Sequence, residues 1–471
     1  MVVKLDEILD EQKTYFNSGA TLDVDFRIEK LKILKSAVAN YKEKIVSAVY
    51  KDLRKPEFEA HTTEILPVLE DLNHAIRNLK KWAAPERVKT PFYLGALGTV
   101  ESFIVNEPLG NTLIISPFNY PFQLSIVPLI GAIAAGNTVI IKPSSDTIYT
   151  TKILMEMINS IFAREYVYVL DPKTVLYFEL LNKKYDHIFF TGSPYTGKKI
   201  LEAASRNLTP VTLELGGKSP CIVEQSANIE NAARSIMQGK LVNSGQTCIA
   251  PDYLLVQNNT KEYLIEELKK ASKELLGPIP QESENFGRII NEKQFTKLKE
   301  IVTAESENII FGGEIDECGL YVSPTLLDLG EYNDEIFNSP AMQNEIFGPV
   351  LPIITYENAY DIIKKLKKLE KPLAAYIFSN DENIINEFIT SLSFGGGCIN
   401  DTILHGANNN LPFGGVGLSG IGSYHGKFTY DTFSHRKGIL KKKGDKNNKL
   451  LLSPDSDKLN SIKKIEKLME F

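Results

Sequence analysis

The stretch Asn243-Ser244-Gly245-Gln246-Thr247-Cys248-Ile249-Ala250-Pro251 is a polar, glycine-containing turn that carries one cysteine. Helical apolar spacing precedes it at 231–241, and a strand-like apolar run follows it at 253–256. A cysteine in such a loop lies near helix ends and free backbone N–H groups, which can hold part of it as the reactive thiolate. Most cysteines, however, are small buried apolar residues. Cys248 is therefore a candidate nucleophile whose role depends on the motifs around it.

Four further motifs surround this turn in the chain. One of them, Val211-Thr212-Leu213-Glu214-Leu215-Gly216-Gly217-Lys218-Ser219-Pro220, places a carboxylate among apolar residues and then two glycines. The others are Ser116-Pro117-Phe118-Asn119-Tyr120-Pro121, Glu345-Ile346-Phe347-Gly348-Pro349-Val350 and Leu411-Pro412-Phe413-Gly414-Gly415-Val416-Gly417. Together with the cysteine turn they resemble the aldehyde dehydrogenase superfamily, and its class 3 branch most closely. The resemblance extends from about Tyr15 to about His435.

The composition restricts the class of protein. A chain of 471 residues, 43% of them hydrophobic, is long enough for two or more globular domains. A net charge of -6 argues against a nucleic-acid binder, because phosphate contacts need a concentrated basic surface. The cysteines are widely spaced and fit no zinc pattern, so we expect no metal site and a reducing compartment.

The N-terminus and one uncharged run bear on targeting and on membrane insertion. The N-terminus carries acidic residues where a secretory signal would have its apolar region, so we expect a cytoplasmic protein. Residues 108–141 contain no charged side chain, but Pro117, Pro121 and Pro128 interrupt the run. We therefore predict strand, loop, buried helix and strand there, not a transmembrane segment.

The order of predicted elements indicates an α/β fold. Apolar runs of buried-strand type at 112–115, 138–141, 166–170 and 187–191 alternate with helical spacing at 153–162 and 174–181. Amphipathic helices over 5–82 would cover this doubly wound layer, and a second α/β unit begins after Leu215. With the resemblance, we expect two doubly wound parallel-sheet domains and a small bridging β-sheet. Residues 1–95 and 112–214 would bind the dinucleotide, 215–423 would form the catalytic domain, and 96–111 and 424–440 would bridge a homodimer.

Phosphate recognition does not follow the usual GxGxxG pattern. Instead the strand at 187–190 leads into Thr191-Gly192-Ser193-Pro194-Tyr195-Thr196-Gly197-Lys198 and then a helix. A helix N-terminus favours an anion, because its free N–H groups and the helix dipole are both positive there. In the family this turn lies against the pyrophosphate of NAD or NADP, with Ser193 at the contact. The resemblance assigns Gly192, Gly197, Leu215 and Gly216 to the same cofactor.

Lys142 ends a predicted buried strand, where open α/β sheets bind ligands. The resemblance implies that it bonds the ribose of the adenosine half. This chain has Ser145 where the family commonly has an acidic residue. A carboxylate there would hold the ribose hydroxyls and repel a 2′-phosphate, whereas a serine would not repel it. We therefore expect NAD, NADP or both as cofactor.

The resemblance implies oxidation of an aldehyde to a carboxylic acid. Attack by the Cys248 thiolate gives a thiohemiacetal, whose oxyanion meets the Asn119 side-chain amide and the Cys248 backbone N–H. Loss of hydride to NAD(P)⁺ leaves a thioester. Glu214, in an apolar strand that raises its pKa, would activate the water that hydrolyses it.

The roles of the two carboxylates have alternatives. In one alternative, Glu214 has no catalytic role and is only paired with a nearby lysine such as Lys218. Glu345 is the competing base, although the resemblance places it and Phe347 at the nicotinamide ribose. Two further functions stay open: transfer of the acyl group to coenzyme A, and a catalytically silent structural protein on the same fold.

Aromatic residues near the motifs suggest the substrate. Tyr120 and Phe413, with Phe122, are expected to line an apolar funnel. By analogy with class 3 relatives, we expect medium- or long-chain aliphatic or aromatic aldehydes. His405 and His425 lie in glycine-rich loops and are interpreted as structural.

The last segment, 441–471, opens with a basic linker. Apolar residues at helical spacing then predict a short amphipathic helix with one stripe, formed by Leu459, Ile462, Ile465 and Leu468. The segment carries too many charges to span a membrane. We favour a solvated tail or a dimer-docking helix, and weak peripheral contact with anionic lipid is the alternative.

Overall fold

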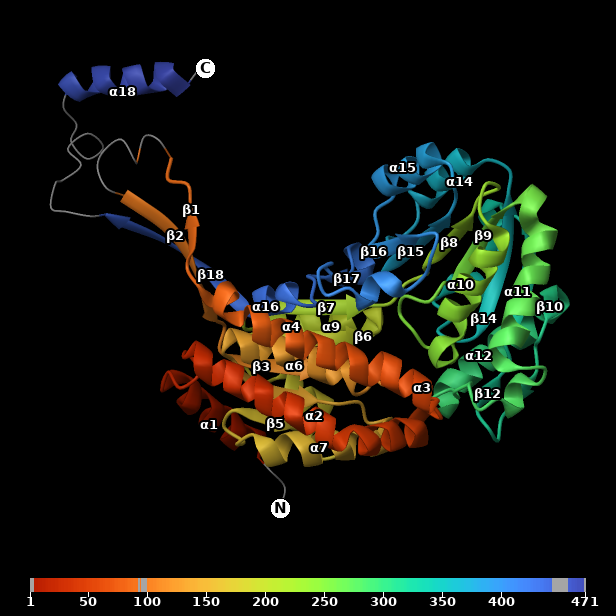
Figure 1. The fold of residues 1–471 in the computed structure, drawn as a ribbon, viewed down its shortest axis with the longest axis horizontal. Coiled ribbons are helices and arrows are strands. Elements are labelled where there is room, and N and C mark those ends of the chain that lie inside the picture. Colours follow the sequence, from red (N-terminus) through yellow and green to blue (C-terminus); the bar gives the residue numbers. More distant parts are fainter. Residues whose placement is uncertain (1–3, 92–93, 95–99, 443–455, 470–471) are drawn as a thin grey trace.

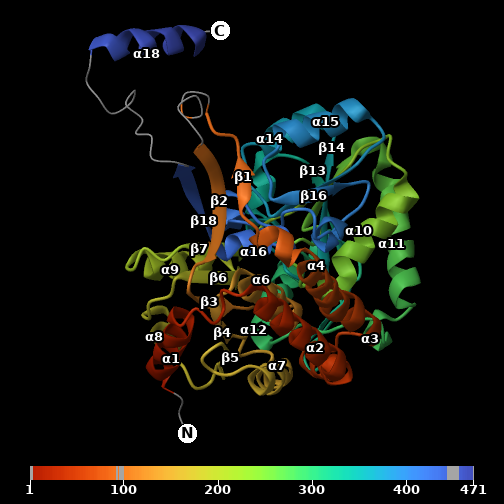
Figure 2. The same ribbon diagram turned by 60° about the vertical axis from the view of Figure 1, so that its left-hand side comes forward.

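The computed structural model describes residues 4–91, 94, 100–442 and 456–469 (Figure 1). Two large, mostly parallel sheets are each covered by helices, and a small antiparallel sheet projects from the first of them. Figure 2 shows the same three parts from a second side. This arrangement confirms the predicted α/β class with two doubly wound sheets and a bridging sheet.

The N-terminal helices form a layer over the first sheet. They are α1 (Leu5–Asn17), α2 (Val24–Leu53), α3 (Glu57–Ala60), the π-helical turn η1 (His61–Ile65) and α4 (Leu66–Ala83). Helix α2 begins after Asp23, whose carboxylate accepts the N–H groups of Asp25 and Phe26 at 2.7 and 3.2 Å. Its apolar stripe, which includes Leu31 and Leu34, is fully buried. The prediction of amphipathic covering helices is therefore confirmed.

The first sheet has six strands in the order β17–β7–β6–β3–β4–β5. They are β3 (Asn111–Ile115), β4 (Thr138–Lys142), β5 (Val167–Val169), β6 (His187–Gly192), β7 (Val211–Leu215) and the antiparallel edge strand β17 (Gly420–Ile421). The helices between them are α6 (Gln123–Ala135), α7 (Ile148–Ile161), α8 (Tyr177–Leu181) and α9 (Pro194–Ser205).

Alternate residues of each strand face opposite helix layers. Ile114 packs in the cluster that contains α2, α4 and α6, whereas Leu113 and Ile115 pack in the cluster that contains α1 and α9. One predicted element differs: the helix expected at 174–181 begins only at Tyr177. The Thr174 N–H instead closes a turn on the Asp171 carbonyl at 3.0 Å.

The second sheet has seven strands in the order β10–β13–β14–β9–β8–β15–β16. They are β8 (Pro220–Val223), β9 (Tyr253–Gln257), β10 (Ile309–Phe311), β13 (Thr325–Glu331), β14 (Val350–Tyr356), β15 (Ala374–Phe378) and β16 (Gly396–Ile399). The covering helices are α10 (Ile229–Leu241), α11 (Lys261–Leu276), α12 (Glu292–Ala304), α13 (Pro340–Gln343), α14 (Ala359–Leu366) and α15 (Glu382–Ser391). A two-stranded hairpin, β11 (Ile315–Asp316) and β12 (Tyr321–Val322), lies beside them.

The motif at 211–220 crosses from one sheet to the other, because β7 ends at Leu215 and β8 begins at Pro220. The chain returns at β17, which pairs with β7 and so joins the first sheet, although its residues fall in the segment 215–423. The domain boundaries themselves stay a prediction.

The small sheet consists of β1 (Glu86–Val88), β2 (Val100–Pro108) and β18 (Ser434–Lys442), all antiparallel. Strand β1 was not predicted. Helix α16 (Lys427–Thr432) occupies part of the segment expected to bridge at 424–440, and β18 continues two residues into the expected basic tail.

The predicted C-terminal helix is present as α18 (Ser456–Met469), which lies beyond the small sheet (Figure 1). Leu459 of its expected apolar stripe is exposed. Lys443 of the basic linker and the side chains of Ile462, Ile465 and Leu468 lie outside the described residues.

The uncharged segment at 108–141 forms β3, a loop, the buried helix α6 and β4, as predicted. In the described part of the chain, no helix combines the length and the apolar character that a membrane span requires.

Helix α6 packs closely on α16 through Gly131. A Cβ at this position would lie 2.2 Å from Thr429 Cγ2 and 2.9 Å from the Thr429 carbonyl carbon. We expect Gly131→Ala to lower the melting temperature, because overpacking costs about 1–3 kcal/mol and outweighs the better helix propensity of alanine. Circular dichroism during thermal unfolding measures the change. Gly438→Ala in β18 is the matched control, since nothing lies within 4 Å of its added Cβ; equal melting temperatures for both variants would contradict the close packing.

Candidate active site

The cysteine turn begins at the end of α10 with the 3-10 turn η2 (Val242–Gly245). Asn243, Ser244 and Gly245 all have left-handed backbones, with φ of 54°, 53° and 76°. A Cβ on Gly245 would lie 2.3 Å from the Gly348 carbonyl carbon, so the turn packs directly on the motif at 345–350. Two motifs that are a hundred residues apart in the chain are therefore neighbours.

Cys248 and Glu214 lie close together in a poorly solvated space. Burial raises the pKa of the Glu214 carboxyl to about 7. Burial, and then the Glu214 carboxylate, raise the pKa of the Cys248 thiol well above its usual range. Among the described residues Glu214 Oε1 has no hydrogen-bond partner. Both effects favour the protonated thiol, because desolvation and a nearby negative charge oppose the charge of a thiolate. The expectation that the loop holds Cys248 partly as thiolate stays a prediction.

Lys218 does not pair with Glu214. Its Nζ forms an ion pair with the Asp252 carboxylate and donates to the carbonyls of Ala341 and Asn344, at 2.9 and 3.1 Å. The alternative in which Glu214 is only the partner of Lys218 is therefore wrong.

Glu345 faces the same motif from the other side. A Cβ on Gly216 would lie 2.1 Å from Glu345 Oε2, so a larger residue there would displace the carboxylate from the backbone. Burial, then the charge of Asp252, raise the pKa of Glu345 to about 8, while Lys297 opposes the shift. Phe347, with a φ of 55°, packs edge-on against Phe118 at 5.8 Å between ring centroids.

Asn119 is buried beside the cysteine turn. Its Nδ2 donates to the Gln246 carbonyl at 3.0 Å, and its own carbonyl accepts Nδ2 of Asn243 at 2.9 Å. An amide nitrogen carries two N–H donors, and the described residues provide one acceptor for them. The structure thus brings Asn119, Glu214 and Cys248 to one region, as the sequence motifs predict.

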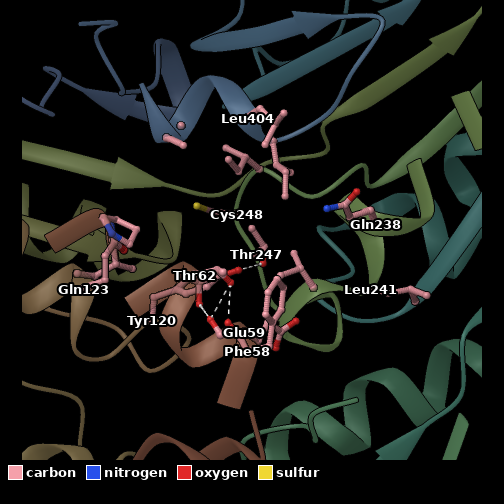
Figure 3. A pocket seen from close by; sticks show the side chains of 18 of the residues that line it. Phe58, Glu59, Thr62, Tyr120, Gln123, Gln238, Leu241, Thr247, Cys248 and Leu404 are labelled. Atoms are coloured by element: carbon pink, nitrogen blue, oxygen red, sulfur yellow. Dashed lines mark hydrogen bonds between the residues drawn. The ribbon is translucent and has the colours of Figure 1, made fainter. Parts of the chain in front are cut away.

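A cavity of about 650 Å³ leads to Cys248 (Figure 3). Tyr120 and Phe413 line it as predicted, together with the largely apolar wall residues Phe58, Leu241, Ile249, Leu276, Ile403 and Leu404. Phe122 does not line it; this residue is fully buried in the core. The prediction for Phe122 is wrong because the chain enters helix α6 directly after it, which turns its ring inward.

The histidines near the cavity are uncharged. The His425 ring stacks on Phe413 at 4.9 Å, and burial lowers its pKa to about 4. His405 Nδ1 lies 3.5 Å from the sulfur of Cys398, not near Cys248, and burial lowers its pKa to about 4 as well.

The predicted cofactor residues follow one edge of the first sheet. Lys142, Gly192 and Leu215 end the parallel strands β4, β6 and β7, so they share the carboxyl edge where α/β sheets bind ligands. Ser193 caps α9, because its Oγ accepts the Thr196 N–H at 3.4 Å. Gly197 and Leu215 contact each other, since a Cβ on Gly197 would lie 2.8 Å from Leu215 Cδ2.

A second cavity, of about 770 Å³, is lined by Ser193, Gly216 and Glu345 among others. Lys142 lies away from it at the end of β4, with its Nζ 5.5 Å from the Tyr177 ring centroid; burial lowers the pKa of Lys142. Ser145 is exposed on the loop that follows. An open glycine turn at a helix N-terminus and a lysine at the same sheet edge fit an extended dinucleotide.

Sequence reasoning missed the contribution of the N-terminal helices. Lys55, Glu59 and Glu64 all lie near the cysteine turn, and Glu59 Oε1 accepts the Asn243 N–H at 2.7 Å. Burial raises the pKa of Glu59 to about 7. In the sequence these charges look like the solvated face of an amphipathic helix; the π-helical turn η1, which is frequent at functional sites, has no signature there.

Comparison with known proteins gives one family. The aldehyde dehydrogenase family model matches residues 3–439. The chain is 46% identical to 4,4'-diaponeurosporen-aldehyde dehydrogenase of Staphylococcus aureus, covering 96% of this chain and 97% of that one. It is 41% identical to the dimeric NADP-preferring aldehyde dehydrogenase of Canis lupus familiaris, over 93% and 94% of the two chains. The structure of substrate-bound AldH of Staphylococcus aureus matches with a TM-score of 0.94 and 44% identity, covering 98% and 99%.

The chain belongs to the aldehyde dehydrogenase family, whose members use NAD or NADP. Within the family it is close to the family 3 enzymes, and it oxidises aldehydes.

The Cys248–Glu214 contact can be tested by alkylation. The apparent pKa of Cys248, taken from the pH dependence of its reaction with iodoacetamide, should be lower in Glu214→Gln than in the wild type, because a neutral amide removes the nearby negative charge. Peptide mass spectrometry follows Cys248, and the exposed Cys318 in the same digest is the internal control. A Cys248 profile that stays unchanged would show that the carboxylate does not face the thiol.

Proposed function

We propose that this enzyme oxidises apolar aldehydes to carboxylic acids through a thiohemiacetal and a thioester on Cys248, with Glu214 as the base that activates water. The observation that carries the proposal is the position of Cys248 in the wall of a largely apolar cavity, with the buried Glu214 carboxyl close to its thiol. A carboxylate with a pKa near 7 is half ionised at neutral pH, which suits a general base.

The thiol proton passes to the Glu214 carboxylate as the sulfur attacks the aldehyde carbon. The oxygen of the resulting thiohemiacetal takes hydrogen bonds from the second Nδ2–H of Asn119 and the Cys248 backbone N–H; one such donor is worth about 10²–10³ in rate. Bound NAD or NADP supplies the acceptor for the hydride that leaves the carbon. Glu214 first releases its proton to solvent. It then takes a proton from the water that attacks the thioester. The carboxylic acid leaves as product, and the proton on Glu214 returns to the sulfur, which restores the Cys248 thiol.

The cavity supports a substrate with an apolar body. Its wall is built of aliphatic and aromatic side chains, which favour medium- or long-chain aliphatic or aromatic aldehydes over small polar ones. The name of the Staphylococcus aureus relative, an enzyme for diaponeurosporen-aldehyde, is consistent with this class.

Residues of the second cavity would hold the cofactor. Glu345, whose charge reaches Cys248, suits the nicotinamide ribose together with Phe347 two residues further on, while Ser193 and the N-terminus of α9 suit the pyrophosphate. Lys142 at the end of β4 suits the adenosine ribose. We keep Glu214 as the base over Glu345, because Glu345 is held against Gly216 on the cofactor side.

We also propose a homodimer, with β2 and β18 as the strands nearest the partner. The long β18–β2 pairing builds a projecting arm, and the Canis lupus familiaris relative is named dimeric. The reducing compartment inferred from the cysteines suits the cytoplasm.

Three enzymes assayed with hexanal and benzaldehyde test the chemistry. The wild type should form reduced cofactor steadily, and Cys248→Ala should form none. Glu214→Gln should form reduced cofactor more slowly than the wild type, because the thiol proton has lost its acceptor, and should stop at one equivalent per site, because no base activates the water that hydrolyses the thioester. Wild-type turnover that requires added coenzyme A would favour the acylating alternative, and activity in Cys248→Ala would exclude the covalent scheme.

Cofactor choice is tested at Ser145. Ser145→Glu should lower kcat/KM for NADP by about 10-fold while changing that for NAD much less, because one like charge near a phosphate costs about 1 kcal/mol or more even in a watery environment. Fluorescence titration with NADPH and NADH gives the two dissociation constants directly. Ser145→Ala is the neutral control; similar losses with both cofactors in Ser145→Glu would remove position 145 from the 2′-phosphate site.

A further inference from the structure

A buried ion pair lies under the loop that carries Asn119. Lys55, just after the end of α2, and Glu64, in the π-helical turn η1, are both fully buried, and their Nζ and Oε1 atoms are 2.6 Å apart. Neither residue lines the cavity that leads to Cys248. The pair is therefore placed to act on the site through other residues.

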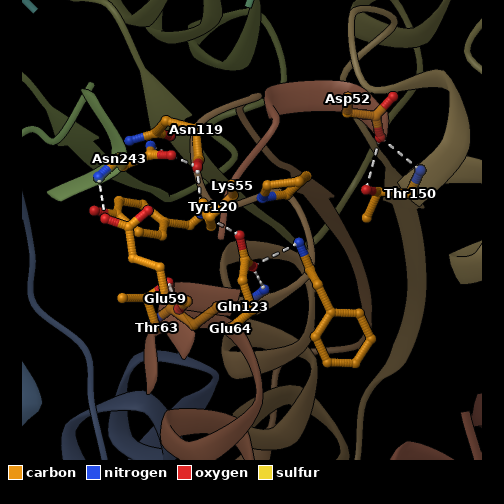
Figure 4. Close-up of polar contacts among 12 residues, drawn as sticks. Asp52, Lys55, Glu59, Thr63, Glu64, Asn119, Tyr120, Gln123, Thr150 and Asn243 are labelled. Atoms are coloured by element: carbon orange, nitrogen blue, oxygen red, sulfur yellow. Dashed lines mark hydrogen bonds and ion pairs between the residues drawn. The ribbon is translucent and has the colours of Figure 1, made fainter. Parts of the chain in front are cut away.

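The pair is hydrogen-bonded to both ends of the loop from 119 to 123 (Figure 4). Lys55 Nζ donates to the Asn119 carbonyl at 3.1 Å. Glu64 Oε2 accepts the backbone N–H groups of Phe122 and Gln123 at 3.1 and 2.9 Å, where α6 begins. Every hydrogen bond from the pair to the loop goes to the backbone, so the pair fixes the path of the loop.

The same loop touches the cysteine turn at three points. The Asn119 carbonyl accepts Asn243 Nδ2 at 2.9 Å, and Asn119 Nδ2 reaches the Gln246 carbonyl at 3.0 Å. The Tyr120 hydroxyl bonds to Thr247, next to Cys248, while Lys55 Nζ lies 4.1 Å from the centroid of the Tyr120 ring. A displacement of Lys55 is thus passed to Asn119 and Tyr120 together.

Stability alone does not account for two buried charges. Desolvation costs several kcal/mol for each ion, and a well-packed apolar pair of similar volume is often as stable or more so. An apolar pair, however, offers no donor to the Asn119 carbonyl and no acceptor for the N–H groups of Phe122 and Gln123. What the ion pair adds is a defined position for this loop.

We propose that Lys55 and Glu64 are positioning residues that hold the Asn119 amide where the thiohemiacetal oxygen forms. The proposal rests on the oxyanion role proposed above for Asn119. Misplacement of a reacting group by about 1 Å can cost about 100-fold in rate. The pair therefore acts chiefly on kcat through Asn119, because Tyr120 and Gln123 of this loop are two among many residues that line the cavity that sets KM.

A double-mutant cycle in the full-length enzyme separates this role from simple support of the fold. We expect Asn119→Ala to lower kcat with benzaldehyde by about 10²–10³. Lys55→Met should lower kcat by about 10–100-fold with KM changed less than about 3-fold. In the Asn119→Ala background Lys55→Met should have almost no further effect on kcat, because the group through which it acts is gone.

Two further variants complete the test. Lys55→Met combined with Glu64→Leu replaces the charges by an apolar pair; it should fold, by circular dichroism, and show the same loss of kcat. Lys261→Met breaks the partly buried Lys261–Asp328 pair, far from the site on α11 and β13, and should leave kcat unchanged.

Effects of Lys55→Met and Asn119→Ala that multiply would overturn the proposal, as would full kcat in the apolar-pair variant. If Asn119→Ala itself kept full kcat, the oxyanion role would fail first, and the positioning proposal with it.

Discussion

Cys248 and Glu214 occupy one desolvated space, and the rest of the site is built around the difficulty of placing charge there. Burial, and then the Glu214 carboxylate, raise the pKa of the Cys248 thiol, and burial raises the pKa of Glu214 itself. Glu345 is a third acidic group, whose pKa is raised by burial and then by the charges of Asp252 and Glu214. Three such groups titrate as a coupled set, because ionising one makes ionising the next harder. A thiolate therefore forms only when the Glu214 carboxylate takes its proton and the aldehyde oxygen takes its negative charge. The hydrogen-bond donors of the site matter for this reason: they receive the charge that the resting site does not tolerate.

The fold brings these groups together from opposite sheets. Glu214 lies near the end of β7 in the first sheet, and the motif that contains it crosses directly to the second sheet at β8. Cys248 comes from the turn after α10, and that turn is held against the motif at 345–350 by the contact of Gly245 with Gly348. Left-handed backbones at Asn243 and Ser244 are part of this geometry. Strain of this kind persists only where the surroundings fix it, and here the Glu59 carboxylate and the Asn119 carbonyl do so.

The fold class and the main site motifs were accessible from the sequence because their signals are local. Buried strands read as apolar runs, and Glu214, Cys248 and Asn119 stand in short motifs that resemble a known family. What the sequence did not reveal depends on distant contacts. The raised pKa of Cys248 needs the nearness of Glu214, and the Lys218–Asp252 pair joins residues on different elements. Strand β1 escaped for another reason: it pairs with the next strand, β2, but its three exposed residues are too few to show a periodicity. In the sequence, Lys55 and Glu64 resemble charged residues on the solvated face of a helix.

The walls of the cavity and the chemistry at its end come from different parts of the chain. Phe58, Leu276 and Leu404 belong to the N-terminal layer, to α11 and to the loop after β16, whereas the reacting groups lie at strand ends and in the cysteine turn. A change of size in the wall alters which aldehyde enters, yet it leaves Glu214 desolvated, because this carboxyl is buried in β7 and does not line the cavity. The Lys55–Glu64 pair links the segments that form the wall to those that carry the reacting groups. It lies in the layer that supplies the wall but holds the backbone of the loop that supplies Asn119. Substrate choice can therefore vary widely on this scaffold as long as the hydrogen bonds from Lys55 and Glu64 to that loop are kept.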